Sequence, residues 1–456
     1  MTSATTGTSE VTIGPQLGRI TFPCFEGLRA LAAVMVVVHH AASLAGPAST
    51  PRAVRIPAEV MDSGVAVFFV LSGFLIYRPF AAAHQSGRAL PPTMAFWWRR
   101  LLRLVPAYWL ALTFFWFLGS FDLGRDWWRY YLFLQIYSRT TVLGGLVQAW
   151  SLCTEVTFYL MVPVWAWLVG RLVGERRLAT VVNLVGCALL YGTGFASRAV
   201  ISDRNPLWRG ITFQWLPTNL DLFAVGMVVA VISVEVQRGG RIGAAANRFA
   251  QPALAWWAAA VTLFAWYAWR VGAPVGAQLA DPNGAYRGFF WHQRQFTLGL
   301  LSLLLLVPAV FGDQDRGLAR RALRWRPVAW VGAVSYGLYL WHFDWMKRAL
   351  PRPDNAFGTG GWSGWFTLPE GVSGFLVILA VGLAVGLLFA AVSWELVERP
   401  LLRFKDLVAR TAPGHVPPVP VPPPIDGEIV PDEARGPGRS RSSGSGGSLP
   451  ADLPKG

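Results

Sequence analysis

The sequence carries little charge for its length. Asp, Glu, Lys and Arg make up 14% of its 456 residues, whereas soluble domains carry about 25%. Hydrophobic residues reach 54%, and the mean hydropathy is +0.41. This composition excludes an ordinary soluble domain of this length and indicates an integral membrane protein.

Cysteine is also scarce. Cys24, Cys153 and Cys187 show no paired spacing, and each lies in or beside an apolar stretch where a small hydrophobic residue would serve. We therefore expect neither a disulfide nor a metal site. The N-terminal segment 1–24 lacks the basic start and the cleavage site of a secretory signal, so the first apolar stretch is expected to stay in the protein.

Lysine is nearly absent: the sequence contains three lysines and 37 arginines. The formal charge of +15 does not indicate a nucleic-acid partner, since the arginines lie in short loops between apolar stretches. The predicted inner loops hold 16 basic residues over 65 positions, and the outer loops, which include 271–294, hold 12 over 95. This asymmetry predicts that both termini are cytoplasmic. The expected partner is the lipid bilayer of a bacterial cell membrane.

Ten stretches of about 20 mostly apolar residues are long enough to cross the hydrocarbon core. Their centres lie near Met35, Phe69, Leu112, Phe158, Val185, Phe223, Ala260, Leu304, Ser335 and Val381. The run 127–137 is a candidate eleventh, half-buried segment. The sequence thus predicts an all-α integral membrane protein of about ten transmembrane helices. Residues 1–24 form a polar segment, 25–405 the membrane domain, and 406–456 a disordered cytoplasmic tail rich in Pro, Gly and Ser.

Two ionisable residues share one face of the first apolar stretch. From Arg29 to His40 there are three helical turns, about 16 Å, and the two side chains project about 20° apart. His39 points about 100° away. Ionisable side chains within a span usually face the bundle interior or a water-filled cavity. Spacing alone leaves two interpretations open, a functional polar stripe and a histidine that only links helices by hydrogen bonding.

Six short sequence blocks along the chain favour the functional interpretation of this stripe. They are FEGLRALAAVMVVVHH (25–40), GVAVFFVLSGFLI (64–76), FWWRRLLRLVPAYW (96–109), WSLCTEVTFYLMVP (150–163), VSYGLYLWH (334–342) and VERPLLRF (397–404). In this order they resemble the membrane-bound acyltransferase-3 family, whose members O-acylate polysaccharides, lipid-linked glycans and other envelope molecules. The resemblance covers about residues 25 to 404.

The resemblance implies roles for the first helix. Arg29 and His40 match the family's Arg-x10-His element, which makes His40 the catalytic histidine, whereas His39 is expected to be structural. The implied donor is cytosolic acyl-CoA, most simply acetyl-CoA, and the acceptor is usually on the outer side. A histidine suits the removal of an alcohol proton at neutral pH, and an acyl-histidine intermediate is the open alternative.

Other charged residues have both a functional and a structural interpretation. Arg99, Arg100 and Arg103 could bind the phosphates of coenzyme A, and Arg100-x-x-Arg103 matches a family element. The positive-inside rule explains the same arginines without a ligand. Glu26, where the family more often has Asp, could orient Arg29 or the donor, or it could only favour the helix N-terminus.

The second and fourth blocks contain candidates for the substrate site. Glu155 lies in an otherwise apolar span and is expected to partner Arg29, His40 or a substrate hydroxyl. Ser72 and its neighbour Gly73 are expected to allow close helix packing, and Ser72 could also line the site. Many relatives have an acidic residue where this chain has Ala66, and Asp62 could supply that charge from one turn earlier.

In the fifth block, Ser335, Tyr336, Tyr339 and His342 are expected near the outer half of the ninth helix. The tyrosines fit interfacial anchors. Tyr336 and His342 are also candidate substrate contacts. Acceptor specificity is expected in the outer loops, including 352–371.

The function predicted from these residues is the O-acylation of a hydroxyl on a glycan, glycolipid or secondary metabolite. A transporter or flippase is the alternative from another class, but the two corresponding halves typical of transporters are not evident. A third interpretation is an acyl-group translocator that works with a separate transferase, because the tail is expected to be too short for a further domain. The sequence is also compatible with a homo-oligomer.

Overall fold

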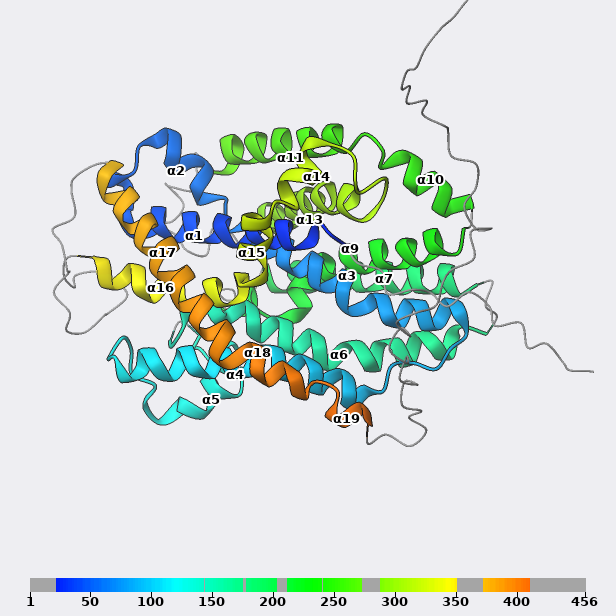
Figure 1. The fold of residues 1–456 in the computed structure, drawn as a ribbon, viewed down its shortest axis with the longest axis horizontal. Coiled ribbons are helices and arrows are strands. Elements are labelled where there is room, and N and C mark those ends of the chain that lie inside the picture. The colour runs from blue at the N-terminus through cyan, green and yellow to red at the C-terminus, as the bar shows by residue number, and fades with distance from the viewer. Residues whose placement is uncertain are drawn as a thin grey trace, which may run out of the picture. The chain divides into compact units, whose positions relative to one another are not determined.

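The computed structural model describes residues 22–142, 144–174, 178–202, 211–239, 241–272, 288–350 and 372–410. Within these ranges the secondary structure is helical (Figure 1). The predicted N-terminal segment up to residue 21, the loop 352–371 and the tail beyond residue 410 lie outside the described residues, so the predictions made for them are untested.

The helices follow the predicted apolar stretches. The α-helices are α1 (Phe25–Ser49), α2 (Arg52–Glu59), α3 (Ser63–Ser86), α4 (Thr93–Phe117), α5 (Trp127–Tyr131), α6 (Trp150–Leu172), α7 (Ala179–Ser202), α9 (Leu216–Gln237), α10 (Arg241–Phe249), α11 (Ala253–Tyr267), α13 (Gly288–Val310), α14 (Leu318–Leu323), α15 (Arg326–Ala333), α16 (Ser335–Ala349), α17 (Val372–Ser393), α18 (Arg399–Leu401) and α19 (Leu407–Arg410). Two π-helical turns, Ala268–Gly272 and Trp394–Glu398, extend α11 and α17.

Seven described segments are long and apolar enough to cross a membrane, which confirms the all-α membrane class. They are Phe25–Gly46, Arg52–Ser86, Val147–Leu172, Ala179–Ile201, Leu216–Gln237, Phe289–Val310 and Val372–Phe404. The other predicted spans correspond to α4, which contains three arginines, to the 15-residue α11, and to the region around Ser335. The total of ten spans and the cytoplasmic termini remain predictions.

The chain near Ser335 differs from the single helix that was predicted. Helix α15 ends at Ala333 and α16 begins at Ser335, with Val334 outside helical geometry at φ −95° and ψ 8°. Gly332 in α15 lies so close to the first turn of α1 that a Cβ would be 1.8 Å from the Glu26 carbonyl oxygen. This contact between backbones places α15 against α1 before α16 enters the bundle.

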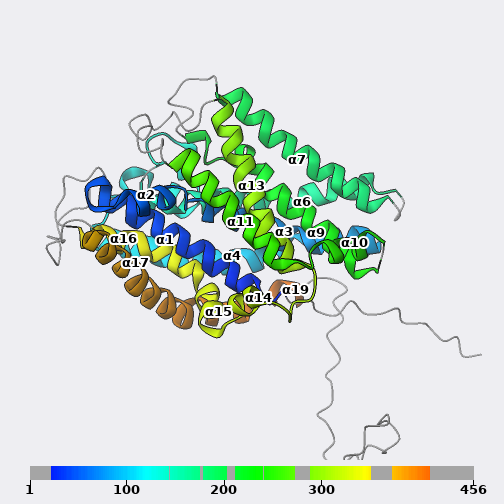
Figure 2. The same cartoon turned by 90° about the horizontal axis from the view of Figure 1, so that it is seen from above.

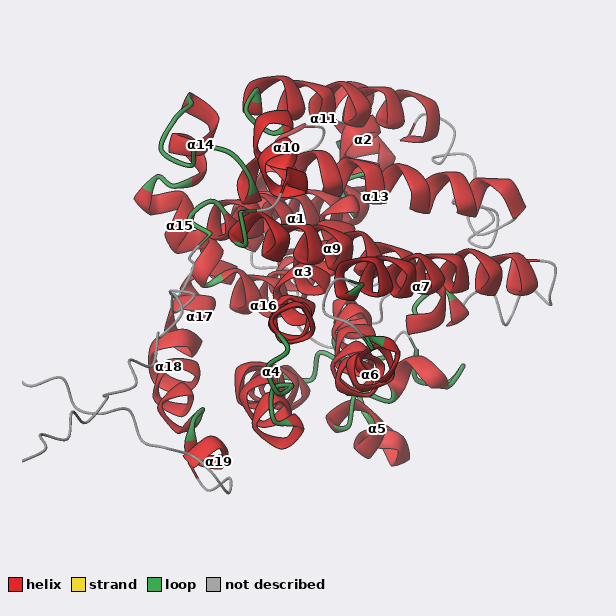
Figure 3. Cartoon of the chain, turned by 90° about the vertical axis from the view of Figure 1, so that its right-hand side faces the viewer, coloured by secondary structure: helices red, strands yellow, loops and turns green. Residues whose placement is uncertain are grey.

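Helices α3 and α9 form the tightest pair in the centre of the bundle. A Cβ on Gly73 of α3 would lie 2.1 Å from the Phe223 carbonyl oxygen, and one on Gly226 of α9 would lie 2.0 Å from that of Val70. Of the two neighbours Ser72 and Gly73, it is therefore Gly73 that allows the predicted close helix packing. Figures 1 and 3 show α11 and α13 on one side of α1, α3 and α9, and α4, α5 and α6 on the other.

Helices α7 and α17 lie on opposite sides of the bundle (Figure 2). Only 28% of the apolar window in α17 is buried, whereas 72% of that in α9 is buried. Because α17 covers α16, nearly the whole of α16 is enclosed by protein. The prediction that Tyr336 and Tyr339 anchor at a lipid interface is therefore wrong, since both point into the bundle.

The predicted half-buried segment 127–137 contains only the five-residue helix α5 and a 3-10 turn at Gln135–Tyr137. Tyr130 and Ile136 are buried, whereas Trp127 is exposed. The segment is half-buried as expected, but it is not a further spanning helix.

Candidate active site

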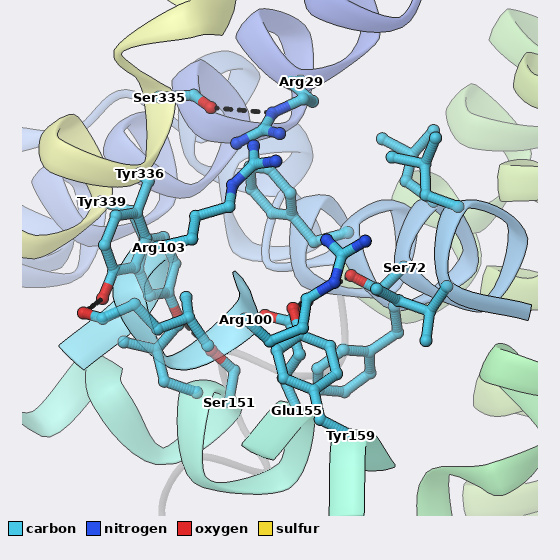
Figure 4. A pocket seen from close by; sticks show the side chains of 17 residues that line it. Arg29, Ser72, Arg100, Arg103, Ser151, Glu155, Tyr159, Ser335, Tyr336 and Tyr339 are labelled. Carbon is cyan, nitrogen blue, oxygen red and sulfur yellow. Dashed lines mark hydrogen bonds between the residues drawn. The ribbon is translucent and has the colours of Figure 1, made fainter. Parts of the chain in front are cut away.

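Two cavities lie one after the other along α1. The first, here called the arginine cavity, has polar lining residues Arg29, Ser72, Arg100, Arg103, Ser151, Glu155, Tyr159, Ser335, Tyr336 and Tyr339 (Figure 4). The second, here called the histidine cavity, has a volume of about 220 Å³. Its lining includes His39, His40, Asp62, Trp150, Phe213, Asn219, Trp291, Arg294, Gln295 and Tyr339.

Helix α1 contributes to both cavities. Arg29 in its second turn lines the arginine cavity, and His40, three turns later, lines the histidine cavity. The predicted orientation of both side chains toward the bundle interior is confirmed. The two residues do not share one site, however, because the eleven-residue spacing places them in neighbouring cavities.

Three guanidinium groups gather in the arginine cavity. The Arg29 Nε donates to Ser335 Oγ at 3.3 Å, and its distance to Glu26 Oε2 is 3.8 Å. The guanidinium groups of Arg29 and Arg103 lie beside each other in Figure 4. Within the described part of the chain, neither Arg100 nor Arg103 forms a salt bridge with a carboxylate. Their positive charge is therefore available to an anionic ligand.

Arg99 differs from the other two arginines of its cluster. It does not line the arginine cavity, and its Nη1 lies 4.0 Å from Asp406 Oδ1 at a partly exposed position. A helix turns by about 100° per residue. Arg100 and Arg103, three positions apart, can therefore face one cavity, whereas Arg99 faces another direction.

Glu155 is the acidic residue of the arginine cavity. Its Oε1 accepts hydrogen bonds from the Ser72 hydroxyl and, at 2.5 Å, from the Tyr159 hydroxyl. The predicted pairing with Arg29 or His40 is not what the structure shows. Its role toward a substrate hydroxyl stays a prediction. Ser72 lies on α3, which packs closely against α9, and it also lines the cavity. The structure therefore agrees with both roles expected for Ser72.

Helix α16 contributes two tyrosines that are hydrogen-bonded to neighbouring helices at the arginine cavity. The Tyr336 hydroxyl donates to the Leu104 carbonyl oxygen at 2.6 Å. The Tyr339 hydroxyl is 2.7 Å from both the Gln148 carbonyl oxygen and Ser151 Oγ. These bonds attach α16 to α4 and to the start of α6.

His40 and His342 form a pair of hydrogen-bonded imidazoles. His40 Nδ1 lies 2.8 Å from His342 Nε2, and His342 Nδ1 lies 2.9 Å from the Leu338 carbonyl oxygen. Because a carbonyl only accepts, neutral His342 must carry its proton on Nδ1 and accept through Nε2. Neutral His40 then donates from Nδ1, which leaves its Nε2 without a proton. This tautomer suits a general base or a nucleophile.

His342 lines neither cavity, so the structure places it behind His40 rather than at the predicted substrate contact. His39 lines the histidine cavity, and its Nδ1 lies 3.0 Å from the Ala58 carbonyl oxygen. This bond ties α1 to α2 and agrees with a structural role.

The histidine cavity contains an ion pair that was not predicted from the sequence. Arg294 forms a salt bridge with Asp62 and donates from Nη1 to the Tyr267 hydroxyl at 2.9 Å. The sequence predicts Arg294 in the loop 271–294, but α13 already begins at Gly288. The signal was present in FFWHQRQFTLGLL (289–301), where an arginine interrupts an apolar run. Asp62 does lie in the same cavity as Ala66, as the sequence suggested.

The chain matches one known protein family over most of its length. The acyltransferase domain of the acyltransferase-3 family matches residues 22–392. The chain belongs to this family. The matched region includes every candidate site residue named above.

Curated proteins match about 70% of this chain. The chain is 23% identical over 354 residues to the putative peptidoglycan O-acetyltransferase YrhL of Bacillus subtilis, covering 72% of this chain and 49% of the relative. It is 22% identical over 347 residues to the peptidoglycan O-acetyltransferase OatA of Listeria monocytogenes (72% and 50%), and 24% over 349 residues to the O-acetyltransferase OatA of Staphylococcus aureus (70% and 50%). The chain thus spans about half the length of these relatives. No solved structure matches it.

Proposed function

We propose that this protein is a membrane O-acyltransferase that moves an acetyl group from acetyl-CoA to a hydroxyl of a cell-envelope glycan. The observation that carries the proposal is a cationic cavity beside a second cavity that is lined by His40, which is hydrogen-bonded to the buried His342 behind it. The relatives named as peptidoglycan O-acetyltransferases support acetyl as the group and a glycan as the acceptor.

The arginine cavity suits the donor. Coenzyme A carries a pyrophosphate and a 3′-phosphate, and guanidinium groups bind such anions with two parallel hydrogen bonds. Arg100 and Arg103 would hold these groups, with Arg29 at the side of the cavity nearer His40 along α1. A cytosolic donor would then enter the arginine cavity from the cytoplasmic side of the bacterial cell membrane, and the acceptor would enter the histidine cavity from the opposite side.

The histidine cavity suits the chemical step. In direct transfer, His40 Nε2 takes the acceptor's hydroxyl proton while that oxygen attacks the thioester carbonyl carbon. The carbon–sulfur bond breaks, and the proton returns from His40 to the leaving thiolate. In the two-step alternative, Nε2 attacks the thioester carbonyl carbon, and coenzyme A leaves as its thiolate. The acceptor oxygen then attacks the acyl carbon, the bond to Nε2 breaks, and the acceptor's proton ends on the thiolate. Both routes need the tautomer that His342 favours, so His342 is a positioning residue.

The proposal is tested by acetyl-CoA turnover in purified protein reconstituted in vesicles, read as released thiol and as acetylated glycan. We expect His40→Gln to abolish both. The matched control is His84→Gln, because His84 is also a buried histidine with two contacts, to Asn183 and to the Ala166 carbonyl. Turnover by wild type with equal turnover by His40→Gln would refute the assignment, and thiol release without acetylated glycan would favour an acyl-group translocator.

A further inference from the structure

Gln295 of α13 lines the histidine cavity together with His40. Only 6% of its surface is exposed. Most of the other lining residues are apolar or aromatic, among them Val65, Leu222 and Phe213. In cavities of this kind, a few fixed polar atoms determine how a ligand is oriented. The direction in which the Gln295 amide points therefore affects what can bind beside His40.

The neighbouring Asn219 of α9 determines that direction. Its Nδ2 donates to the carbonyl oxygens of Phe213 at 2.8 Å and Trp215 at 3.0 Å, so its Oδ1 must face the other way. Gln295 Nε2 donates to this Oδ1 at 3.0 Å and to the Thr218 carbonyl oxygen at 3.3 Å. Because both partners of Gln295 Nε2 are acceptors, the amide of Gln295 cannot be turned around.

Gln295 Oε1 is consequently the end of this amide that remains for a ligand. Within the described part of the chain, no protein group donates a hydrogen bond to it, and it is not among the fully enclosed oxygens. A polar atom in such a cavity loses free energy when a ligand displaces water from it without replacing the hydrogen bond. Hydroxyl and amide N–H groups can make that bond, whereas ether and ester oxygens cannot.

We propose that Gln295 selects acceptor molecules that carry a second hydroxyl or an N–H group besides the hydroxyl that is acylated. This inference rests on the proposed function and narrows the acceptor to polyhydroxylated or acylamino-bearing molecules, a class that includes sugars. His40 Nε2 serves the reacting hydroxyl, and Gln295 Oε1 accepts the hydrogen bond of the second group. An acceptor with a single hydroxyl leaves the Gln295 oxygen without a partner.

The test compares cyclohexanol with the three positional isomers of cyclohexanediol as acceptors, with acetyl-CoA as donor and the acetylated ring as readout. All four rings have the same size, and the diols differ from cyclohexanol only by the second hydroxyl. For wild type, we expect the kcat/KM of at least one diol to exceed that of cyclohexanol by about tenfold or more, because sites built to bind a substrate hydroxyl strongly reject analogues without it.

Gln295→Met removes the oxygen and keeps an unbranched side chain of similar length. We expect the preference for the diol to disappear because the diol rate falls, while the KM for acetyl-CoA stays within about twofold. Gln85→Met is the matched control. Gln85 of α3 is also a buried glutamine, with Nε2 3.1 Å from the Val231 carbonyl oxygen, but it lines neither cavity. Its diol preference should equal that of wild type.

Gln295→Asn covers the case in which Gln295→Met does not fold. It keeps the amide but shortens the side chain by one methylene, so its oxygen cannot occupy the same place while its nitrogen keeps both bonds. We expect a smaller fall in the diol preference. An unchanged preference in either Gln295 variant would overturn the inference, as would an equal fall in Gln85→Met or a wild type that prefers none of the diols.

A glycan acceptor decides the matter if wild type acetylates the glycan but none of the four rings. In that case the kcat/KM for the glycan should fall about tenfold in Gln295→Met and stay unchanged in Gln85→Met. Equal values in wild type and Gln295→Met would overturn the inference while leaving the proposed function intact. Wild-type protein without acetyl-CoA turnover on any acceptor would instead refute the proposed function.

Discussion

The arginine cavity and the histidine cavity share helix α1 but are built from different chemistry. One holds three guanidinium groups and a carboxylate that is already hydrogen-bonded to neighbouring hydroxyls. The other is lined by His39 and His40, one internal ion pair, two amides and several aromatic rings, and His40 is hydrogen-bonded to His342 behind it. The first favours a multiply charged anion, and the second favours proton transfer and contact with a neutral hydroxyl-bearing molecule. Under the proposed function, this difference separates the binding of the donor from the reaction.

The sharpest way to separate the two cavities is to remove the reacting group alone. His40→Ala should lower the turnover number by a factor of about 100 to 10,000, which is the usual contribution of a positioned general base. The dissociation constant for acetyl-CoA, measured by calorimetry on the same protein, should stay within about twofold because the phosphates bind elsewhere. A parallel loss of donor affinity would show that donor binding and the reaction do not take place in separate cavities.

The converse experiment weakens the arginine cavity. Arg100→Gln with Arg103→Gln should raise the KM for acetyl-CoA by about 100-fold or more, because each of the two lost charge-assisted hydrogen bonds contributes about 1.5–3 kcal/mol. The turnover number at saturating donor should change less. Added salt should reduce the difference between variant and wild type.

Arg99→Gln is the control for that experiment. It removes the same charge one residue away, from a side chain that lies outside the cavity near Asp406. Its KM should stay within about twofold of wild type. A KM as high as that of the double variant would restore the interpretation from the sequence, in which all three arginines bind the donor.

The sequence predicted residue types and helix faces better than it predicted partners. The direction of Arg29 and His40 followed from helical geometry, because eleven steps return to nearly the same face. The hydrogen bond between His40 and His342 could not be predicted, since 302 residues separate them and only the packing of α16 beside α1 brings them together.

The two clearest differences from the sequence interpretation have different causes. The sequence predicts Arg294 in a loop, but α13 starts earlier than expected, at Gly288. The sequence predicts that the tyrosines of α16 are lipid anchors, because hydropathy does not show that the more apolar α17 covers that helix. The first difference concerns a helix boundary, and the second depends on which helices pack together, which a single sequence does not contain.

The hydrogen bond between His40 and His342 offers a finer comparison at the wall of the histidine cavity. His342→Gln should lower the turnover number by about tenfold, because the glutamine oxygen can still accept a hydrogen bond from His40 but holds it less firmly. His342→Phe should lower it further, since phenylalanine cannot accept. The KM for acetyl-CoA should not change in either variant. Equal rates for glutamine and phenylalanine would show that His342 only fills space.

The smallest expected effect concerns the Asp62–Arg294 ion pair, which lines the same cavity as His40. Asp62→Asn keeps the size of the side chain and removes the charge that pairs with Arg294. If this pair orders the acceptor side, the KM for a soluble glycan acceptor should rise about threefold to tenfold, as expected for one hydrogen bond of about 0.5–1.5 kcal/mol. The KM for acetyl-CoA should stay constant.

Glu59→Gln provides the control, because Glu59 pairs with Arg55 at 3.6 Å and lines neither cavity. A change in acceptor KM of the same size in both variants would indicate a general electrostatic effect. A change confined to the KM for acetyl-CoA would place Asp62 at the donor site.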